Sequence, residues 1–178
     1  MRAALLLCLA TLAPGANAAV LDRIAVTMDN DVITETDVYE EIRVTALQNG
    51  NEPDFSPAAR RVAAERLVDQ DLIRKEMHLS NYPQPSPAEV QKMLDQLRKQ
   101  RFHADDQAYR QALDHYGLTD GELRAHLARQ LMTLRFTDSR FEVGTSATKQ
   151  DGTDQDLEAW LKWSRTQSRI RFHEEAFQ

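Results

Sequence analysis

The sequence predicts a mostly α-helical fold in which a small antiparallel sheet joins the two ends of the chain. Five helix-length segments with apolar residues at i, i+4 spacing follow one another after a short alternating N-terminal stretch. Residues 21–34 alternate as a β-hairpin that turns at Asp29-Asn30-Asp31, and residues 168–173 alternate as a single strand. Because a two-stranded hairpin is marginal alone, we expect the last strand to pair with it.

Capping signals mark the helix boundaries. The first helix follows a threonine cap and ends at glycine, the second and third begin with serine and a first-turn proline, and the fifth opens with a capping box. These signals are, in order, Thr34, Asn49-Gly50, Ser56-Pro57, Ser86-Pro87 and Thr119–Glu122, and Gly117 ends the fourth helix. The fourth helix is predicted over about 105–116 and a last helix over about 154–166.

The composition is that of a globular protein. The chain has 178 residues, 42% of them apolar, and a formal charge of −6. Nucleic-acid-binding domains are usually basic, so this acidity argues against a nucleic-acid partner and against binding to anionic lipid. We also expect no membrane insertion, because the apolar stretches are shorter than the about 20 residues that a spanning helix needs.

Residues 1–18 have the pattern of an export signal. Arg2 precedes the apolar run from Ala3 to Ala13, and Ala16-Asn17-Ala18 has the small-x-small form of a cleavage site. We expect cleavage after Ala18 and a periplasmic location. Cleavage removes Cys8, the single cysteine, and an exported chain without cysteine suits a periplasm better than a secreted disulfide scaffold.

The remainder of the chain is predicted to form one domain that is closed by its C-terminus. Residues 19–143 form the helical part with its N-terminal hairpin. Residues 144–152 are small and polar and are predicted to be a linker. Residues 153–178 supply the last helix and strand, which we expect to dock back on the same domain.

This order of segments resembles the N-terminal region of SurA-type periplasmic chaperones, followed by their C-terminal helix and strand. The matching residues are Leu21-Asp22, Ile24-Ala25, Asn30, Val32-Ile33, Thr36-Asp37-Val38, Glu65 to Ile73, Tyr116 to Thr119, Leu123-Arg124 and Leu127 to Leu131. The resemblance covers about 20–142 and 154–173. It implies a SurA N-terminal-like fold and ATP-independent binding of unfolded outer-membrane or other exported proteins.

Relatives of this kind commonly carry parvulin-type prolyl-isomerase modules between the two matching parts. Here only 144–152 occupies that position, which is much shorter than the roughly 50 residues of a small domain. The resemblance therefore implies the chaperone part without the isomerase.

Catalytic and metal-binding patterns are weak in this sequence, so we expect no catalytic residue, no metal and no cofactor. The histidines lack a recurrent metal spacing and are predicted to be solvated surface residues, including His126, which shares a helix face with Glu122. Sequence-adjacent carboxylates such as Glu40-Glu41 point in different directions around a helix. The five histidines are His78, His103, His115, His126 and His173.

Methionine and aromatic residues on the helices are the candidate peptide contacts, because methionine adapts to varied partners and aromatic rings offer large contact areas. For any one of them, a place in the core is the more common role. Trp163, beside the Leu157/Trp160/Leu161 face, is the best single candidate. The full set is Met77, Met93, Phe102, Tyr109, Met132, Phe136, Trp160 and Trp163.

We therefore expect a periplasmic chaperone that holds unfolded proteins in an apolar groove without ATP. One alternative is a dedicated partner-binding or assembly subunit of the cell envelope, whose groove is filled by one fixed protein or by a second copy in a homodimer. The other alternative is a peptidyl-prolyl cis-trans isomerase.

Overall fold

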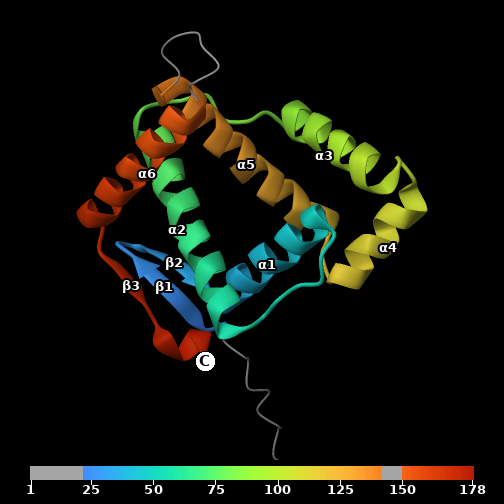
Figure 1. The fold of residues 1–178 in the computed structure, drawn as a ribbon, viewed down its shortest axis with the longest axis horizontal. Coiled ribbons are helices and arrows are strands. Elements are labelled where there is room, and N and C mark those ends of the chain that lie inside the picture. The colour runs from blue at the N-terminus through green and yellow to red at the C-terminus, as the bar shows by residue number, and fades with distance from the viewer. Residues whose placement is uncertain (1–21, 142–149) are drawn as a thin grey trace, which may run out of the picture.

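The structure, a computed structural model, describes residues 22–141 and 150–178. Helices dominate and a three-stranded antiparallel sheet closes one side, which confirms the predicted fold class (Figure 1). In chain order the elements are β1 (Ile24–Met28), β2 (Asp31–Thr34), α1 (Glu35–Asn49), α2 (Pro57–Leu79), α3 (Pro87–Phe102), α4 (Asp106–Tyr116), α5 (Asp120–Phe141), α6 (Gln150–Gln167), β3 (Ile170–Phe172) and the 3₁₀ turn η1 (Glu174–Phe177).

The predicted helix caps are confirmed. Thr34 and Asp37 bond reciprocally at the start of α1, which ends at Gly50 with a left-handed φ of +70°. Glycine adopts this conformation without the steric penalty of a side chain. Ser86 and Glu89 form a second reciprocal cap at α3, and Thr119 and Glu122 form a third at α5.

Glu89 also joins two helices, since it bonds to Ser86 at the start of α3 and pairs with Arg135 of α5. The Ser86 hydroxyl and backbone N–H, with the Arg135 guanidinium, lower the pKa of Glu89 from 4.5 to about 2. The pKa of Glu89 is lower in the folded than in the unfolded protein. Its carboxylate therefore contributes its full stabilisation at pH values above the unfolded pKa of 4.5, and this contribution is lost as the pH falls toward 2.

Glu89→Gln is therefore expected to lower the melting temperature at neutral pH, with the gap to wild type closing between about pH 5 and pH 2. Thermal melts of both proteins across this range test the prediction. A gap of the same size at both ends of the range would contradict it.

The sheet has the order β2-β1-β3, which confirms that the C-terminal strand pairs with the hairpin. Thr27 of β1 lies opposite Val32 on one side and Arg171 on the other. The hairpin turns over two residues, and Asp29 has a left-handed φ of 55°. Both strands differ slightly from the prediction: Asp31 already belongs to β2, and β3 covers only 170–172.

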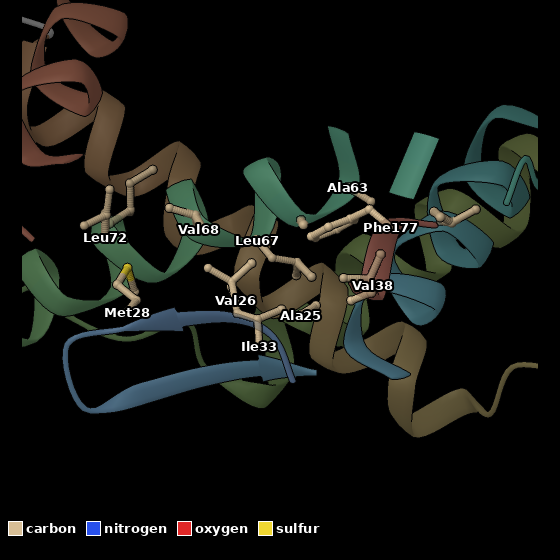
Figure 2. Close-up of a cluster of buried hydrophobic side chains, with 14 of the residues drawn as sticks. Ala25, Val26, Met28, Ile33, Val38, Ala63, Leu67, Val68, Leu72 and Phe177 are labelled. Atoms are coloured by element: carbon tan, nitrogen blue, oxygen red, sulfur yellow. The ribbon is translucent and has the colours of Figure 1, made fainter. Parts of the chain in front are cut away.

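A short C-terminal turn follows β3 and fixes the chain end to α2, which sequence reasoning did not predict. Phe177 is buried and lies close to Ala63 (Figure 2). Arg60 donates to the carbonyl oxygen of Ala176 at 3.3 Å, and Arg61 stacks over the Phe172 ring at 3.9 Å from its centre. Four residues are too few for a periodic pattern, so only tertiary contact defines this turn.

The last helix begins earlier than predicted, at Gln150 instead of about residue 154. Residues 150–152 of the predicted linker therefore belong to α6, and its residues 144–149 lie outside the described part. A single glycine within a helix is tolerated at about 1 kcal/mol, and acidic residues such as Asp154 and Asp156 favour a helix N-terminal region.

The buried side chains form two hydrophobic clusters. The sheet-side cluster joins the sheet, α2 and η1 to one end of α1 and α5. Figure 2 shows Val26 and Met28 of β1 directed at Leu67, Val68 and Leu72 of α2. The far cluster joins the other ends of α1 and α5 to α3 and α4. Its buried members are Val44, Leu47, Val90, Leu94, Tyr109, Leu113, Leu118, Leu123 and Leu127.

Candidate functional site: a groove between four helices

A half-open groove of about 590 Å³ lies between α1, α2, α5 and α6, with one residue from α3. This volume is in the usual range for ligand sites. The groove is lined by Glu41, Thr45, Gln48, Asn49, Arg66, Asp69, Gln70, Ile73, Met93, His126, Gln130, Thr133, Leu134, Leu157 and Leu161. Figure 1 shows how α1, α2 and α5 frame this part of the molecule, with α6 alongside α2.

Part of the groove lining is apolar, and some of it is exposed. Leu134 of α5 is 53% exposed, although it lines the groove. Leu157 and Leu161 of α6 are half-buried against the sheet-side cluster, and Met93 of α3 is half-buried against the far cluster. The apolar wall, as we call these four residues, thus presents flexible aliphatic side chains from three helices.

Another part of the lining is a polar stripe that runs along α1 and α5. Each helix supplies three polar residues at i, i+4 and i+7, and this spacing puts them on one helix face. The polar stripe consists of Glu41, Thr45 and Gln48 on α1 and His126, Gln130 and Thr133 on α5. Gln48 and Gln130 bond to each other across the two helices through both amide groups, at 3.1 and 3.0 Å.

A buried ionisable pair begins the polar stripe. Glu41 is fully buried and His126 is 2% exposed, and His126 Nδ1 lies 3.1 Å from Glu41 Oε2. The contact is close but poorly aligned as a hydrogen bond, so neither atom has a well-directed partner. Arg66 Nη1 donates to Glu41 Oε1 at 3.1 Å and to Thr45 Oγ1 at 3.0 Å, which links α2 to the same site.

These contacts set the charge state of Glu41. Burial by itself raises the pKa of a carboxyl, but His126 and Arg66 outweigh this effect and hold the pKa of Glu41 below its usual value. Glu41 is therefore ionised at neutral pH, and its charge is neutralised by the groups around it.

The remaining carboxylate in the groove is also paired. Asp69 of α2 accepts two bonds from Arg165 of α6, both 2.8 Å long. Burial raises the pKa of Asp69 more than this guanidinium lowers it. Because Glu41 pairs with Arg66 and Asp69 with Arg165, the charges that line the groove compensate one another.

The position of the polar stripe follows from how α1 and α5 cross the two clusters. Val38 and Ile42 of α1 enter the sheet-side cluster, whereas Val44 and Leu47 enter the far cluster. Helix α5 also contributes to both clusters: Phe136 enters the sheet-side cluster, and Leu123 and Leu127 enter the far cluster. The polar stripe occupies the junction between the clusters, where polar side chains of α1 and α5 face one another.

The structure places four of the predicted peptide contacts in the core. Met77 and Phe136 are fully buried in the sheet-side cluster, where the Phe136 and Trp160 rings lie 4.5 Å apart. Tyr109 is buried in the far cluster and donates to Asp120 Oδ1 at 2.6 Å. These four side chains, Met77, Tyr109, Phe136 and Trp160, therefore lie in the packed core, and their contact with a peptide stays a prediction.

The other four predicted contacts do not share one surface. Met132 and Phe102 are half-buried, on the sheet-side and far clusters respectively, and Phe102 packs edge-on against Tyr109. Met93 lines the groove. Trp163 is 57% exposed, as its position beside the apolar face of α6 predicts, but at 100° per residue it lies on the flank away from Leu161. Its contact with clients remains a prediction.

The predicted surface position of His126 is wrong, because this side chain is buried against Glu41. The pair with Glu122 was the misleading signal, since Glu122 instead caps α5. A better signal was available: His126 follows Leu123 by three positions and precedes Leu127, so it lies on the apolar face. Glu41 likewise follows Val38 by three positions.

A second cavity of about 450 Å³ lies on the hairpin side of the same helices and shares Gln70 with the groove. Its lining is mainly charged, with Asp31, Asp37, Glu40 and Asp71 against two arginines. The apolar wall makes the groove the better candidate for binding uncharged polypeptide.

Within residues 22–141 and 150–178, the described side chains, which in α6 start at Asp154, include no three histidines or acidic residues gathered in a way that could hold a metal ion. No helix in these ranges is both long and apolar enough to cross a membrane. In comparisons with known proteins, no family model matches the chain and no curated protein resembles it to a significant degree.

Proposed function

We propose that this protein is a periplasmic chaperone that holds unfolded exported proteins, such as outer-membrane protein precursors, without ATP. The observation that carries the proposal is the groove with its partly exposed apolar wall, which offers aliphatic side chains to a passing chain. The predicted export signal and the order of segments that resembles SurA-type chaperones support the same function.

The groove suits transient binding of many sequences. Aliphatic side chains such as Leu134 and Met93 adapt to different apolar partners, and the compensated charges at Glu41 and Asp69 neither require nor repel a particular charged residue. A client segment that stays mobile outside the groove gives modest buried area, so binding is expected to be weak and fast.

Aggregation assays test this function. A denatured outer-membrane protein is diluted into buffer with an excess of this protein, and light scattering is followed without ATP. The proposal expects suppressed scattering, and it expects the same with an unrelated unfolded client. Suppression with neither client, from a folded and monodisperse sample, would contradict it. Saturable capture of one envelope protein alone would instead favour the dedicated partner-binding subunit.

Leu134→Asp is the matched test of the groove itself. A charge in the apolar wall is expected to weaken client binding about tenfold, since the lost burial of one leucine is of the order of 1.5 kcal/mol. Leu79→Asp is the control, because Leu79 is 78% exposed and lies outside the groove lining. Both variants should melt within a few degrees of wild type. Equal binding by both would contradict a role for the groove.

A further inference from the structure

The polar stripe is long enough to lie along a short segment of a second polypeptide backbone. On each helix its residues rise about 6 Å and then about 4.5 Å, and an extended chain repeats every two residues at roughly 6.6 Å. From Glu41 to Gln48, and from His126 to Thr133, the stripe therefore runs for about 10 Å, the length of three extended residues.

The residues of the polar stripe retain unused hydrogen-bonding capacity. Gln48 and Gln130 each use one amide N–H and one oxygen lone pair in their mutual bonds. Each side chain therefore keeps one free N–H donor and one free lone pair as an acceptor. Thr133 donates its hydroxyl to the carbonyl oxygen of Arg129 at 3.2 Å, which leaves its lone pairs as acceptors. Thr45 accepts from Arg66 and keeps its O–H as a donor.

We propose that the polar stripe binds the backbone of an extended client segment, whose side chains meanwhile pack on the apolar wall. An extended backbone alternates N–H and C=O groups along the chain, and the stripe offers both acceptors and donors within the length of a short extended segment. This inference rests on the proposed function and names what the groove recognises: uncharged extended polypeptide, read through its backbone and hence with little dependence on sequence.

The charges support an uncharged occupant. Glu41 pairs with Arg66 and His126, and Asp69 pairs with Arg165, so no carboxylate that lines the groove is left to attract a basic segment. An acidic segment gains nothing either, because both guanidinium groups are already engaged.

Amide and ester versions of one peptide test the proposal on the wild-type chain. The probe is a blocked, labelled eight-residue peptide of alternating leucine and serine, and in its analogue ester oxygens replace alternate backbone N–H groups. The side chains are the same in both. We expect the ester peptide to bind at least about tenfold more weakly, since each lost hydrogen bond weakens binding about 3- to 10-fold. Equal affinity would overturn the proposal.

A matched pair of threonines on α5 locates the effect. Both Thr133 and Thr137 donate to the carbonyl oxygen four residues earlier, but only Thr133 lines the groove. Thr133→Val is expected to weaken binding of the amide peptide about 3- to 10-fold and to reduce the amide-to-ester difference, whereas Thr137→Val changes neither. Identical behaviour of the two variants would overturn the role of the stripe.

The two proposals fail differently. If the wild-type protein suppresses aggregation but does not distinguish amide from ester, backbone reading is wrong and the holding function stands. If it neither suppresses aggregation nor binds either peptide, both are wrong.

Discussion

Removal of residues 168–178 is expected to destabilise the protein by at least about 3–5 kcal/mol, a large share of the 5–15 kcal/mol that holds a typical domain together. The deletion takes away β3, which pairs with β1, and leaves the hairpin as a two-stranded unit. It also removes Phe177, a buried member of the sheet-side cluster. Phe172, the ring on which Arg61 stacks, is lost as well.

Urea denaturation followed by circular dichroism measures the effect. Phe177→Ala is the graded variant, with an expected loss of about 3 kcal/mol from the cavity that it leaves. Leu79→Ala provides the control, since it truncates an exposed apolar residue away from the C-terminus. A denaturation midpoint unchanged by the deletion would mean that the closure of the sheet by the C-terminus adds no stability.

Single substitutions in the buried Glu41–His126 pair are expected to cost about 2–4 kcal/mol each, because each leaves a buried polar partner behind. Arg66 is partly exposed and still bonds to Glu41, which keeps the loss at the lower end for His126→Leu. The double variant Glu41→Met/His126→Leu removes both groups, so we expect it to lose less than the sum of the single losses.

A double-mutant cycle in urea gives the coupling energy. The exposed pair His115–Glu52, 3.4 Å apart, serves as the control and is expected to contribute no more than about 1 kcal/mol. Since the folded pKa of Glu41 is lowered, its ionised form stabilises the fold above the ordinary value of 4.5, and this contribution is lost as pH falls below it. Additive single losses at neutral pH would contradict the coupling.

Local chemistry explains why the fold could be predicted in such detail. Thr34, Ser86 and Thr119 cap their helices through residues three positions away, so each signal is complete within four residues. The pairing of β3 with the hairpin followed from a general constraint, that an alternating strand needs a sheet. The turn at 174–177 carried neither kind of signal.

The groove was harder to predict because it is defined by which faces of different helices meet. Trp160 and Trp163 differ by only three positions, yet one is buried and the other is mostly exposed. Leu134 continues the apolar spacing of Leu127 and Leu131 in the sequence, but the neighbouring helices leave it at the groove edge. The two i, i+4, i+7 sets of polar residues were readable in the sequence, but their juxtaposition depends on how α1 crosses α5.

The most direct test of the holding function is site-specific photo-crosslinking from the groove. A photoactivatable residue replaces Leu134 in one variant and Leu79 in another, and each is mixed with a labelled, denatured outer-membrane protein before irradiation. The account predicts strong crosslinks to the client from position 134, weak ones from 79, and competition by an unrelated unfolded chain. Crosslinks of equal strength from both positions, or none from position 134 while aggregation is suppressed, would contradict binding in the groove.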